Sequence, residues 1–160
     1  IRKICSKANF LAINVQANSA NYGFNVITKY PKADYVCIDE MELRLATHDR
    51  YSELPTLVKE VCKKLNCQMI IVTRGHHGSL SYSKKTGFIE VPAFTQKVVD
   101  RVGAGDALFA LTAPLVYAKI DLSLISFIGN VAGALQVATV GNKYPIDPKE
   151  LSKFVTRLLT

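Results

Sequence analysis

The sequence predicts an α/β fold in which a mainly parallel sheet is flanked by helices and carries an antiparallel hairpin at one edge. Short apolar runs of strand length alternate with helical stretches along the chain, which is the order of βαβ units. These runs are apolar nearly throughout, as in strands that are buried on both faces. Two further segments with alternating polarity flank a Lys-Lys-Thr-Gly tetrapeptide, which is the pattern of a hairpin.

The composition is that of one globular domain. The chain has 160 residues, of which 49% are hydrophobic and 21% charged, so it can bury a substantial core and lies outside the disordered range. The longest apolar run, Ala107 to Ala118, is too short to span a membrane and is interrupted by Pro114, so we expect no membrane partner. No cysteines show the paired spacing of a zinc site. We interpret Cys62 and Cys67 as buried thiols in a reducing compartment, which indicates a cytoplasmic protein.

The formal net charge of +7 is the one feature that would suit nucleic acid. Lysines and arginines are spread along the chain, however, without a basic run and with few aromatics nearby, unlike typical nucleic-acid-binding segments. A basic protein with anionic substrates would have the same balance. We therefore expect no nucleic-acid partner, and a nucleic-acid-binding domain is the weakest of three functional hypotheses. It predicts binding that depends steeply on salt.

The first half of the chain predicts three helical and two extended elements around a polar loop. In order, we expect the end of a helix, a buried strand, the loop, a second strand, a short helix and a long amphipathic helix over residues 1–8, 10–15, 16–23, 33–38, 39–46 and 52–65. Asp39 is the expected N-cap of the short helix. The long helix has its apolar residues on one stripe, and we assign it to packing on the sheet.

The second half predicts a third strand, a hairpin and three helices. The third strand covers residues 68–73, and the hairpin strands cover 80–83 and 88–91. The first of the helices contains Pro114, which should kink it or end it early. The second is expected to begin at Asp121 and stop at Gly141, and the third to begin at Asp147-Pro148, an N-cap followed by proline at the first helical position.

The stretch with the clearest chemistry is Val98 to Ala110. An apolar run ends in Asp100, a glycine-rich turn follows, and Asp106 stands where an apolar helix begins. Gly103 and Gly105 have no Cβ, so the backbone can bend sharply and approach a ligand closely. The unpaired N–H groups and the dipole of the helix N-terminus favour a phosphate. A carboxylate at Asp106 is suited to removing a proton from a hydroxyl while these amides hold a phosphoryl group.

The alternative interpretation is a tight turn into a helix whose N-terminus favours an acid, and it fits any isolated Gly-x-Gly-Asp. The complete run Asp100-x-x-Gly103-Ala104-Gly105-Asp106 resembles the signature of the PfkB/ribokinase family of sugar and nucleoside kinases. The resemblance covers most of the chain but only the C-terminal half of a family member. It implies a ribokinase-like fold in which residues 1–160 form a single, incomplete nucleotide-binding and catalytic domain.

The resemblance also implies an activity and its cofactors. The chain would be a carbohydrate kinase that transfers the γ-phosphoryl group of ATP to the hydroxyl of a sugar or sugar phosphate, with Mg²⁺ bridging the phosphates. Asp106 would be the catalytic base, and the amides of Gly103, Ala104 and Gly105 would form the anion hole.

Three acids are implied in metal binding. Asp39-x-x-Glu42 is similar to the family's Asn-x-x-Glu, in which the Glu acts through water on Mg²⁺ and the phosphates. Asp39 differs from the Asn because it can hold water or metal but cannot donate an amide hydrogen bond. The alternative is an acidic helix start favoured by the dipole. Asp100 and its neighbours help to hold a monovalent cation in some family members, whereas the guanidinium of Arg101 would disfavour one here.

Two further motifs are implied in nucleotide binding. Thr73-x-Gly75-x-x-Gly78 is similar to the family loop at which a strand ends beside the ATP phosphates, although glycine turns often end strands. Asn130 resembles the position that lies against the adenine. The alternative for Asn130 is a polar residue on a buried helix that is satisfied by a neighbour.

The identity of the sugar is not encoded in these motifs. Thr73-Arg74-Gly75 and Gly129-Asn130 look most like the branch of the family that phosphorylates heptose phosphates. In the family the sugar is held mainly by the N-terminal half and its lid, and nothing here matches that half. The second hypothesis is therefore a nucleotide-binding module or fragment that lacks the sugar site and is inactive alone. Exposed sheet edges would favour a homodimer or membership of a larger chain.

Overall fold

The computed structural model describes residues 1–94, 98–100, 102–140 and 144–160. In this part of the chain, five strands form one sheet in the order β1-β2-β3-β4-β5. The first three strands are parallel, and β4 is antiparallel to both of its neighbours, so every strand except β4 runs in the same direction. The strands are β1 (Ala12–Asn14), β2 (Tyr35–Asp39), β3 (Met69–Thr73), β4 (Ser79–Ser83) and β5 (Gly87–Val91).

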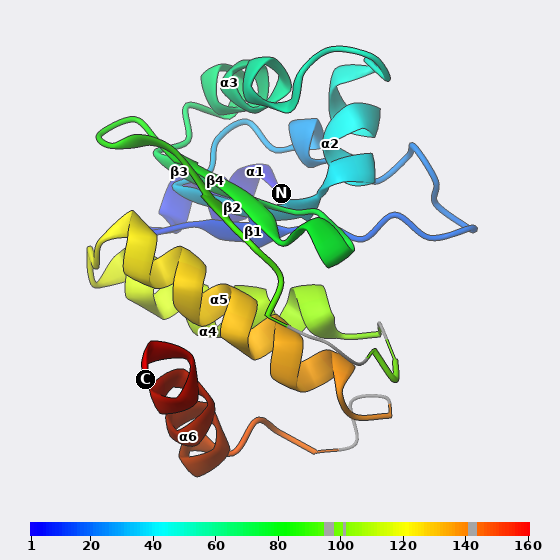
Figure 1. Ribbon diagram of the computed structural model, residues 1–160. Coiled ribbons are helices and arrows are strands. Elements are labelled where there is room, and N and C mark those ends of the chain that lie inside the picture. Colours follow the sequence, from blue (N-terminus) through cyan, green and yellow to red (C-terminus); the bar gives the residue numbers. More distant parts are fainter. Residues whose placement is uncertain (95–97, 101, 141–143) are drawn as a thin grey trace.

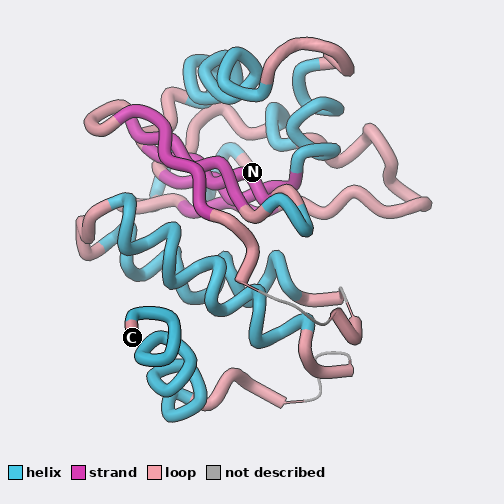
Figure 2. Tube along the Cα trace, viewed as in Figure 1, coloured by secondary structure: helices cyan, strands magenta, loops and turns pink. Residues whose placement is uncertain are grey.

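Helices cover both faces of this sheet (Figures 1 and 2). α2 and α3 lie on one face, α4 and α5 lie on the other, and α6 packs on the outer side of α5. The α-helices are α1 (Arg2–Lys7), α2 (Glu40–Thr47), α3 (Leu54–Leu65), α4 (Ala104–Tyr117), α5 (Leu122–Val137) and α6 (Pro148–Leu159). Two 3-10 turns, η1 (Ile27–Lys29) and η2 (Gly75–His77), precede β2 and follow β3.

The strands alternate between two apolar cores. Val36, Ile38 and Val72 belong to the core under α2 and α3, whereas Cys37 and Ile71 belong to the core under α4. Successive side chains of a strand point to opposite faces, so both faces of β2 and β3 are buried, as the continuous apolar runs predict. The same alternation fixes the direction of the polar residues that follow at the strand ends.

The predicted elements are found, with differences at their ends. Pro114 lies inside α4, which continues beyond it only to Tyr117, where the N–H of Ala118 donates to the carbonyl of Pro114 (2.9 Å). Asp121 directly precedes α5 as predicted, but its side chain makes no capping hydrogen bond within the described part. The predicted helix stop at Gly141 is wrong: α5 ends at Val137, where the N–H groups of Ala138 and Thr139 donate to carbonyls three residues earlier and close the helix. The expected influence of Arg101 lies outside the described residues.

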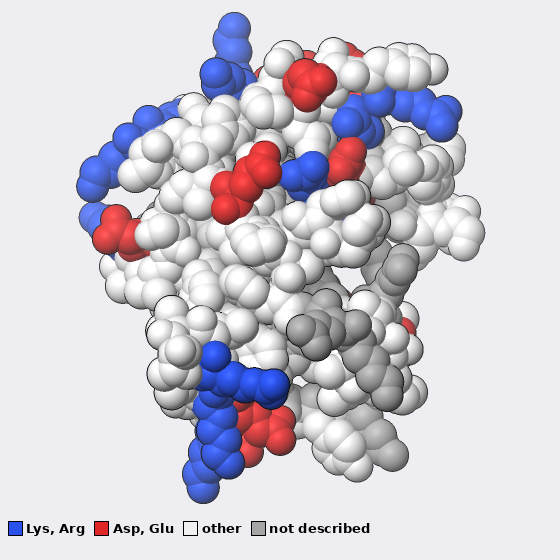
Figure 3. Space-filling model, in the orientation of Figure 1, with Lys and Arg blue, Asp and Glu red and all other residues white. Residues whose placement is uncertain are grey.

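The helices that the structure describes include none with the length and apolar character needed to cross a membrane. On the face shown in Figure 3, lysines and arginines form separate groups rather than one continuous patch. α6 begins as predicted, because the carboxylate of Asp147 accepts from the N–H of Lys149 (2.8 Å).

Candidate functional site

The N-terminus of α4 is built by a glycine bend. Gly103 is the N-cap and has φ of 82°, which favours glycine over any residue with a side chain. Just before it, the carboxylate of Asp100 accepts from the N–H of Val102 (2.9 Å) and closes the turn. The carbonyl of Gly103 accepts from Ala107 (2.9 Å), which begins the helix.

The first turn of α4 carries the N–H groups that the sequence motif assigns to an anion hole. The part of the chain that the structure describes provides no acceptor for the N–H groups of Gly103, Ala104, Gly105 or Asp106. This is the general condition of a helix N-terminus, where the first turn has no acceptors within the helix. Asp106 lies in this turn with an exposed side chain. The expected bend at Gly103 and the exposed position of Asp106 are found, whereas the roles assigned to the amides and to Asp106 stay predictions.

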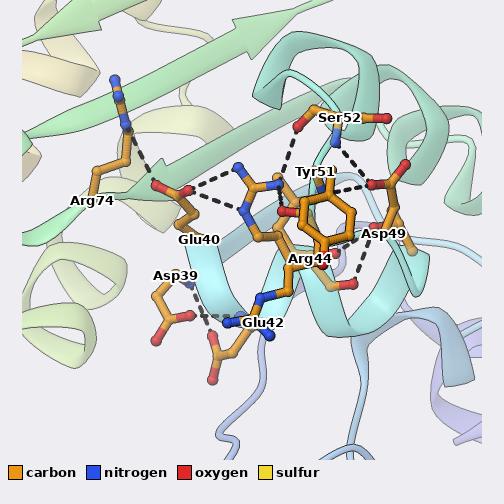
Figure 4. Close-up of polar contacts among 11 residues, drawn as sticks. Asp39, Glu40, Glu42, Arg44, Asp49, Tyr51, Ser52 and Arg74 are labelled. Carbon is orange, nitrogen blue, oxygen red and sulfur yellow. Dashed lines mark hydrogen bonds and ion pairs between the residues drawn. The ribbon is translucent and has the colours of Figure 1, made fainter.

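Glu42 lies where β2 passes into α2, and both of its carboxylate oxygens accept backbone hydrogen bonds (Figure 4). Oε2 accepts from the N–H of Asp39 (3.0 Å), and the carboxylate of Asp39 accepts in return from Glu42 (2.7 Å). This reciprocal pair is a capping box. Oε1 of Glu42 accepts from the N–H of Ala17 (2.9 Å), in the loop after β1. The loop and the start of α2 are therefore held together by one carboxylate.

The electrostatics of Glu42 connect this turn with the N-terminus of α4. Burial raises the pKa of Glu42, the two backbone donors oppose that rise, and the charges of Asp39 and Asp106 add to it. Burial also raises the pKa of the Cys37 thiol to about 12, and the charges of Glu42 and Asp106 contribute. Asp106 thus lies close enough to the end of β2 for its charge to act there. The structure brings Asp39, Glu42 and Asp106 to one edge of the sheet.

These acids fit a metal ion that is held largely by its substrate. Among the described residues no group of three or more acidic, cysteine or histidine side chains is arranged to hold a metal ion by itself. Mg²⁺ characteristically takes one or two carboxylates together with substrate phosphates and water. The oxygens of Glu42 each accept one backbone bond and retain lone pairs for a metal-bound water. The pair Asp39 and Glu42 therefore suits Mg²⁺ that arrives with a nucleotide.

A row of polar side chains crosses the sheet beside these acids. Asp39 pairs with Thr73 in register, and Thr73 pairs with Ser79. By alternation with Ile71, this row faces the side of the sheet that carries α4. Thr73, predicted from its motif, therefore shares a face and an edge with Asp39 of the capping box.

The structure gives different reasons for the two glycines that follow Thr73. Gly75 has φ of 56° and open space where a Cβ would lie, so its backbone is accessible. Gly78 has φ of 79°, and a Cβ there would lie 2.0 Å from the carbonyl oxygen of Val91. The close packing of the η2 turn against the end of β5 thus explains Gly78 without a ligand. The sequence pattern did not distinguish these two roles.

Asn130 is buried on α5 and is satisfied inside the protein. Its Nδ2 donates to Oγ of Ser79 (2.6 Å) and to the carbonyl of Ser126 (2.8 Å). Both amide hydrogens are used in this way, so a contact with adenine would have to use Oδ1. Ser126 also donates to Ser81 (2.8 Å). These bonds attach α5 to β4 and place Asn130 at the end of the row formed by Asp39, Thr73 and Ser79.

An open pocket of about 850 Å³ lies at the same edge of the sheet, around the first turns of α2 and the end of β3. Its lining includes Asp39, Glu40, Arg44, Thr73, Arg74 and Gly75. Sequence reasoning gave no role to Glu40 or Arg44 and noted Arg74 only as part of a motif. Their one local signal is the spacing of Glu40 and Arg44, four residues apart on a helix.

The fold defines a class of protein: an α/β domain with helices on both faces of a mainly parallel sheet and polar residues gathered at the ends of its strands. Residues 1–149 match the family model described as pfkB family carbohydrate kinase, and the chain belongs to this family.

Curated relatives support the assignment at lower coverage. The chain is 27% identical over 124 residues to 2-dehydro-3-deoxygalactonokinase of Haloferax volcanii, which covers 78% of this chain and 38% of that protein. It is 28% identical over 146 residues to the bifunctional protein HldE of Nitrobacter hamburgensis, which covers 88% of this chain and 29% of that protein. The chain thus spans well under half the length of these relatives.

Solved structures share the fold. A nucleoside kinase of Burkholderia thailandensis, in complex with inosine, is similar with a TM-score of 0.64 and 26% identity over 78% of this chain and 40% of that chain. Phosphofructokinase-2 of Escherichia coli, in complex with potassium, is similar with a TM-score of 0.70 and 17% identity over 81% and 42% of the two chains. The predicted ribokinase-like fold, as a partial domain, is confirmed.

Proposed function

We propose that this chain provides the nucleotide-binding and catalytic part of a kinase that transfers the γ-phosphoryl group of ATP to a sugar hydroxyl. The observation that carries the proposal is the N-terminus of α4. There, N–H groups without an acceptor among the described residues stand beside the exposed carboxylate of Asp106. Family membership supports phosphorylation of a carbohydrate.

In this mechanism the amides act on the phosphoryl group and Asp106 acts on the sugar hydroxyl that receives it. The N–H groups of Gly103, Ala104 and Gly105 donate to the oxygens of the moving phosphoryl group and stabilise the charge that spreads over them. The carboxylate of Asp106 accepts the proton of the sugar hydroxyl as its oxygen bonds to phosphorus and the bond to the ADP oxygen breaks. Both are fixed in one helical turn, so their geometry needs little reorganisation.

The acids at the end of β2 have a second role. A triphosphate approaching Asp39, Glu42 and Asp106 meets like charges, which oppose its binding. Mg²⁺, when bound between them, supplies positive charge that offsets this repulsion and orients the phosphates. Glu42 and Asp39 would hold it, through water in the case of Glu42, because the capping box fixes both carboxylates.

The nucleotide would lie along the polar row. Thr73 and the accessible backbone of Gly75 are proposed to contact its phosphates, Gly78 to shape that loop, and Asn130 to approach the adenine through Oδ1. Asp100, which closes the turn before Gly103, is proposed to order this backbone and to lie near any monovalent cation.

The acceptor is proposed to be a small sugar or sugar phosphate. Among these acceptors the motifs Thr73-Arg74-Gly75 and Gly129-Asn130 favour a heptose phosphate. We propose that the protein acts in the cytoplasm and works as a homodimer or as part of a larger chain. The coverage of the relatives favours a second candidate function, in which this part binds nucleotide but does not catalyse transfer without the rest of a kinase.

Two measurements test the proposal. Calorimetric titration with MgATP should show saturable binding to one site per chain. A coupled assay that detects ADP should then show turnover with at least one member of a panel of sugars and sugar phosphates. Binding without turnover would support the second candidate, and absence of nucleotide binding would contradict both.

A further inference from the structure

Arg74 is a partly buried charged group at the edge of the pocket. It follows β3 directly, and its side chain is 24% exposed. Its Nε is shielded from solvent and has no hydrogen-bond partner among the described residues. The nearest acids are Glu40, with Oε2 at 3.8 Å from Nε, and Glu90, with Oε2 at 3.7 Å from Nη1. Both distances exceed that of a hydrogen bond, so the guanidinium is held mainly by charge.

Arg74 lies on the opposite side of the sheet from the proposed phosphate site. Val72 and Leu80 belong to the core under α2 and α3, and Glu90 pairs with Leu80 in register. Arg74 follows the alternation of Val72 and meets Glu40 on α2 and Glu90 on β5 from this side. Arg74 and Thr73 line the same pocket, but the guanidinium of Arg74 faces Glu40 and Glu90 rather than the row that contains Thr73.

Glu40, the first residue of α2, connects Arg74 to this helix. Its Oε1 accepts from Nε and Nη2 of Arg44 (3.1 and 3.0 Å), while its Oε2 faces Arg74 (Figure 4). Nη1 of Arg44 donates in turn to the carbonyls of Arg50 and Ser52. Glu40 is thus fixed between two guanidiniums, one from β3 and one anchored to the segment that leads to α3.

This arrangement bears on the capping box because Glu40 is the first residue of α2. Asp39 and Glu42, on either side of it in the sequence, are the carboxylates proposed to hold Mg²⁺. Three acids within one turn repel each other, and the two guanidiniums next to Glu40 reduce that repulsion. Without Arg74, Glu40 would keep only Arg44 as a compensating charge, and this turn would lose its link to the residue that follows β3.

We propose that Arg74 is a positioning residue which, through Glu40, holds the first turn of α2 so that Asp39 and Glu42 can accept Mg²⁺ bound to the nucleotide. The inference rests on the proposed function. Arg74 makes no contact with the nucleotide in this proposal, so the effect of Arg74 on nucleotide binding depends on the presence of Mg²⁺.

The test compares ADP binding with and without Mg²⁺ by calorimetry, using Arg74→Gln, Arg74→Lys and the matched control Glu90→Gln. Arg74→Gln should weaken binding of MgADP about fivefold, the size expected for loss of one partly buried ion pair. Its binding of ADP in a metal chelator should stay within twofold of wild type. Arg74→Lys should restore most of the loss with Mg²⁺, and Glu90→Gln should bind as wild type does.

Glu40→Gln breaks the same link from the other side and should show the same metal-dependent loss, so the test does not depend on the folding of one variant. Unchanged binding of MgADP by Arg74→Gln and Glu40→Gln would overturn the inference. An equal loss with and without Mg²⁺ would overturn it too, because it would indicate direct contact with phosphate. Failure of the wild type to bind MgADP would instead refute the proposed function.

Discussion

Gly78→Ala tests whether the glycine of the Thr73-x-Gly75-x-x-Gly78 motif serves the fold or the ligand. Gly78 has φ of 79° and ψ of −129°, a region that residues with a side chain occupy at a cost of about 1–3 kcal/mol. Its new Cβ would lie 2.0 Å from the oxygen of Val91 and 2.6 Å from the carbonyl carbon of Pro92. These are backbone atoms, so relief requires the end of β5 to move, at a further cost of about 1–3 kcal/mol.

The expected total is about 4 kcal/mol, which for a domain of this size lowers the melting temperature by about 10 °C. Gly87→Ala, at the start of β5, is the matched control, since Gly87 has φ of 81° and a Cβ there would have no described atom within 4 Å. It should cost only about 1–2 kcal/mol. Thermal and urea unfolding followed by circular dichroism measure both. If Gly78→Ala is no more destabilising than Gly87→Ala, close packing against the end of β5 does not explain this glycine.

Three further predictions follow from burial. Burial raises the pKa of Glu42 in the folded protein above its value in the unfolded chain. At pH values between these two pKa values the folded protein binds the proton more readily, so the stability of the wild type falls as the pH rises. The melting temperature of Glu42→Gln should therefore rise relative to that of the wild type between about pH 4 and about pH 7. A difference in melting temperature that stays the same across this range would contradict this. The described cysteines are all buried, and burial raises the pKa of Cys37 to about 12. A disulfide reagent should label none of the thiols in the native protein and all of them in denaturant; rapid native labelling of Cys37 would be incompatible with its position. Asn130→Ala removes two buried hydrogen bonds and should cost about 1–3 kcal/mol of unfolding free energy, and a loss below about 0.5 kcal/mol would show that α5 is held otherwise.

Local patterns predicted those parts of the fold that local physics decides. The continuous apolar runs predicted strands buried on both faces, and β2 and β3 are such strands. Asp39 was identified as an N-cap because its residue type and position suffice for that role, and the structure adds the reciprocal bond from Glu42. The bend at Gly103 and the exposed acid at Asp106 were likewise readable from residue types alone.

The remaining features depend on pairs that are distant in the sequence. The N–H of Ala17 bonds to Glu42 across 25 positions, and Asn130 bonds to Ser79 across 51; neither partner carries a local signal. The Gly78 motif suggested access to a ligand, whereas the structure places the backbone of β5 against it. Arg74 could not be connected to Glu40 without the sheet register.

We propose that Asp106 removes the proton of the acceptor while the amides beside it hold the phosphoryl group. Asp106→Asn tests it most directly, because it keeps the size and exposure of the side chain but removes its basicity. Calorimetry with MgATP and the coupled ADP assay should show an affinity within about threefold of wild type and turnover reduced at least about a thousandfold. Substantial turnover in this variant, or a loss of nucleotide affinity as large as the loss of turnover, would contradict the account.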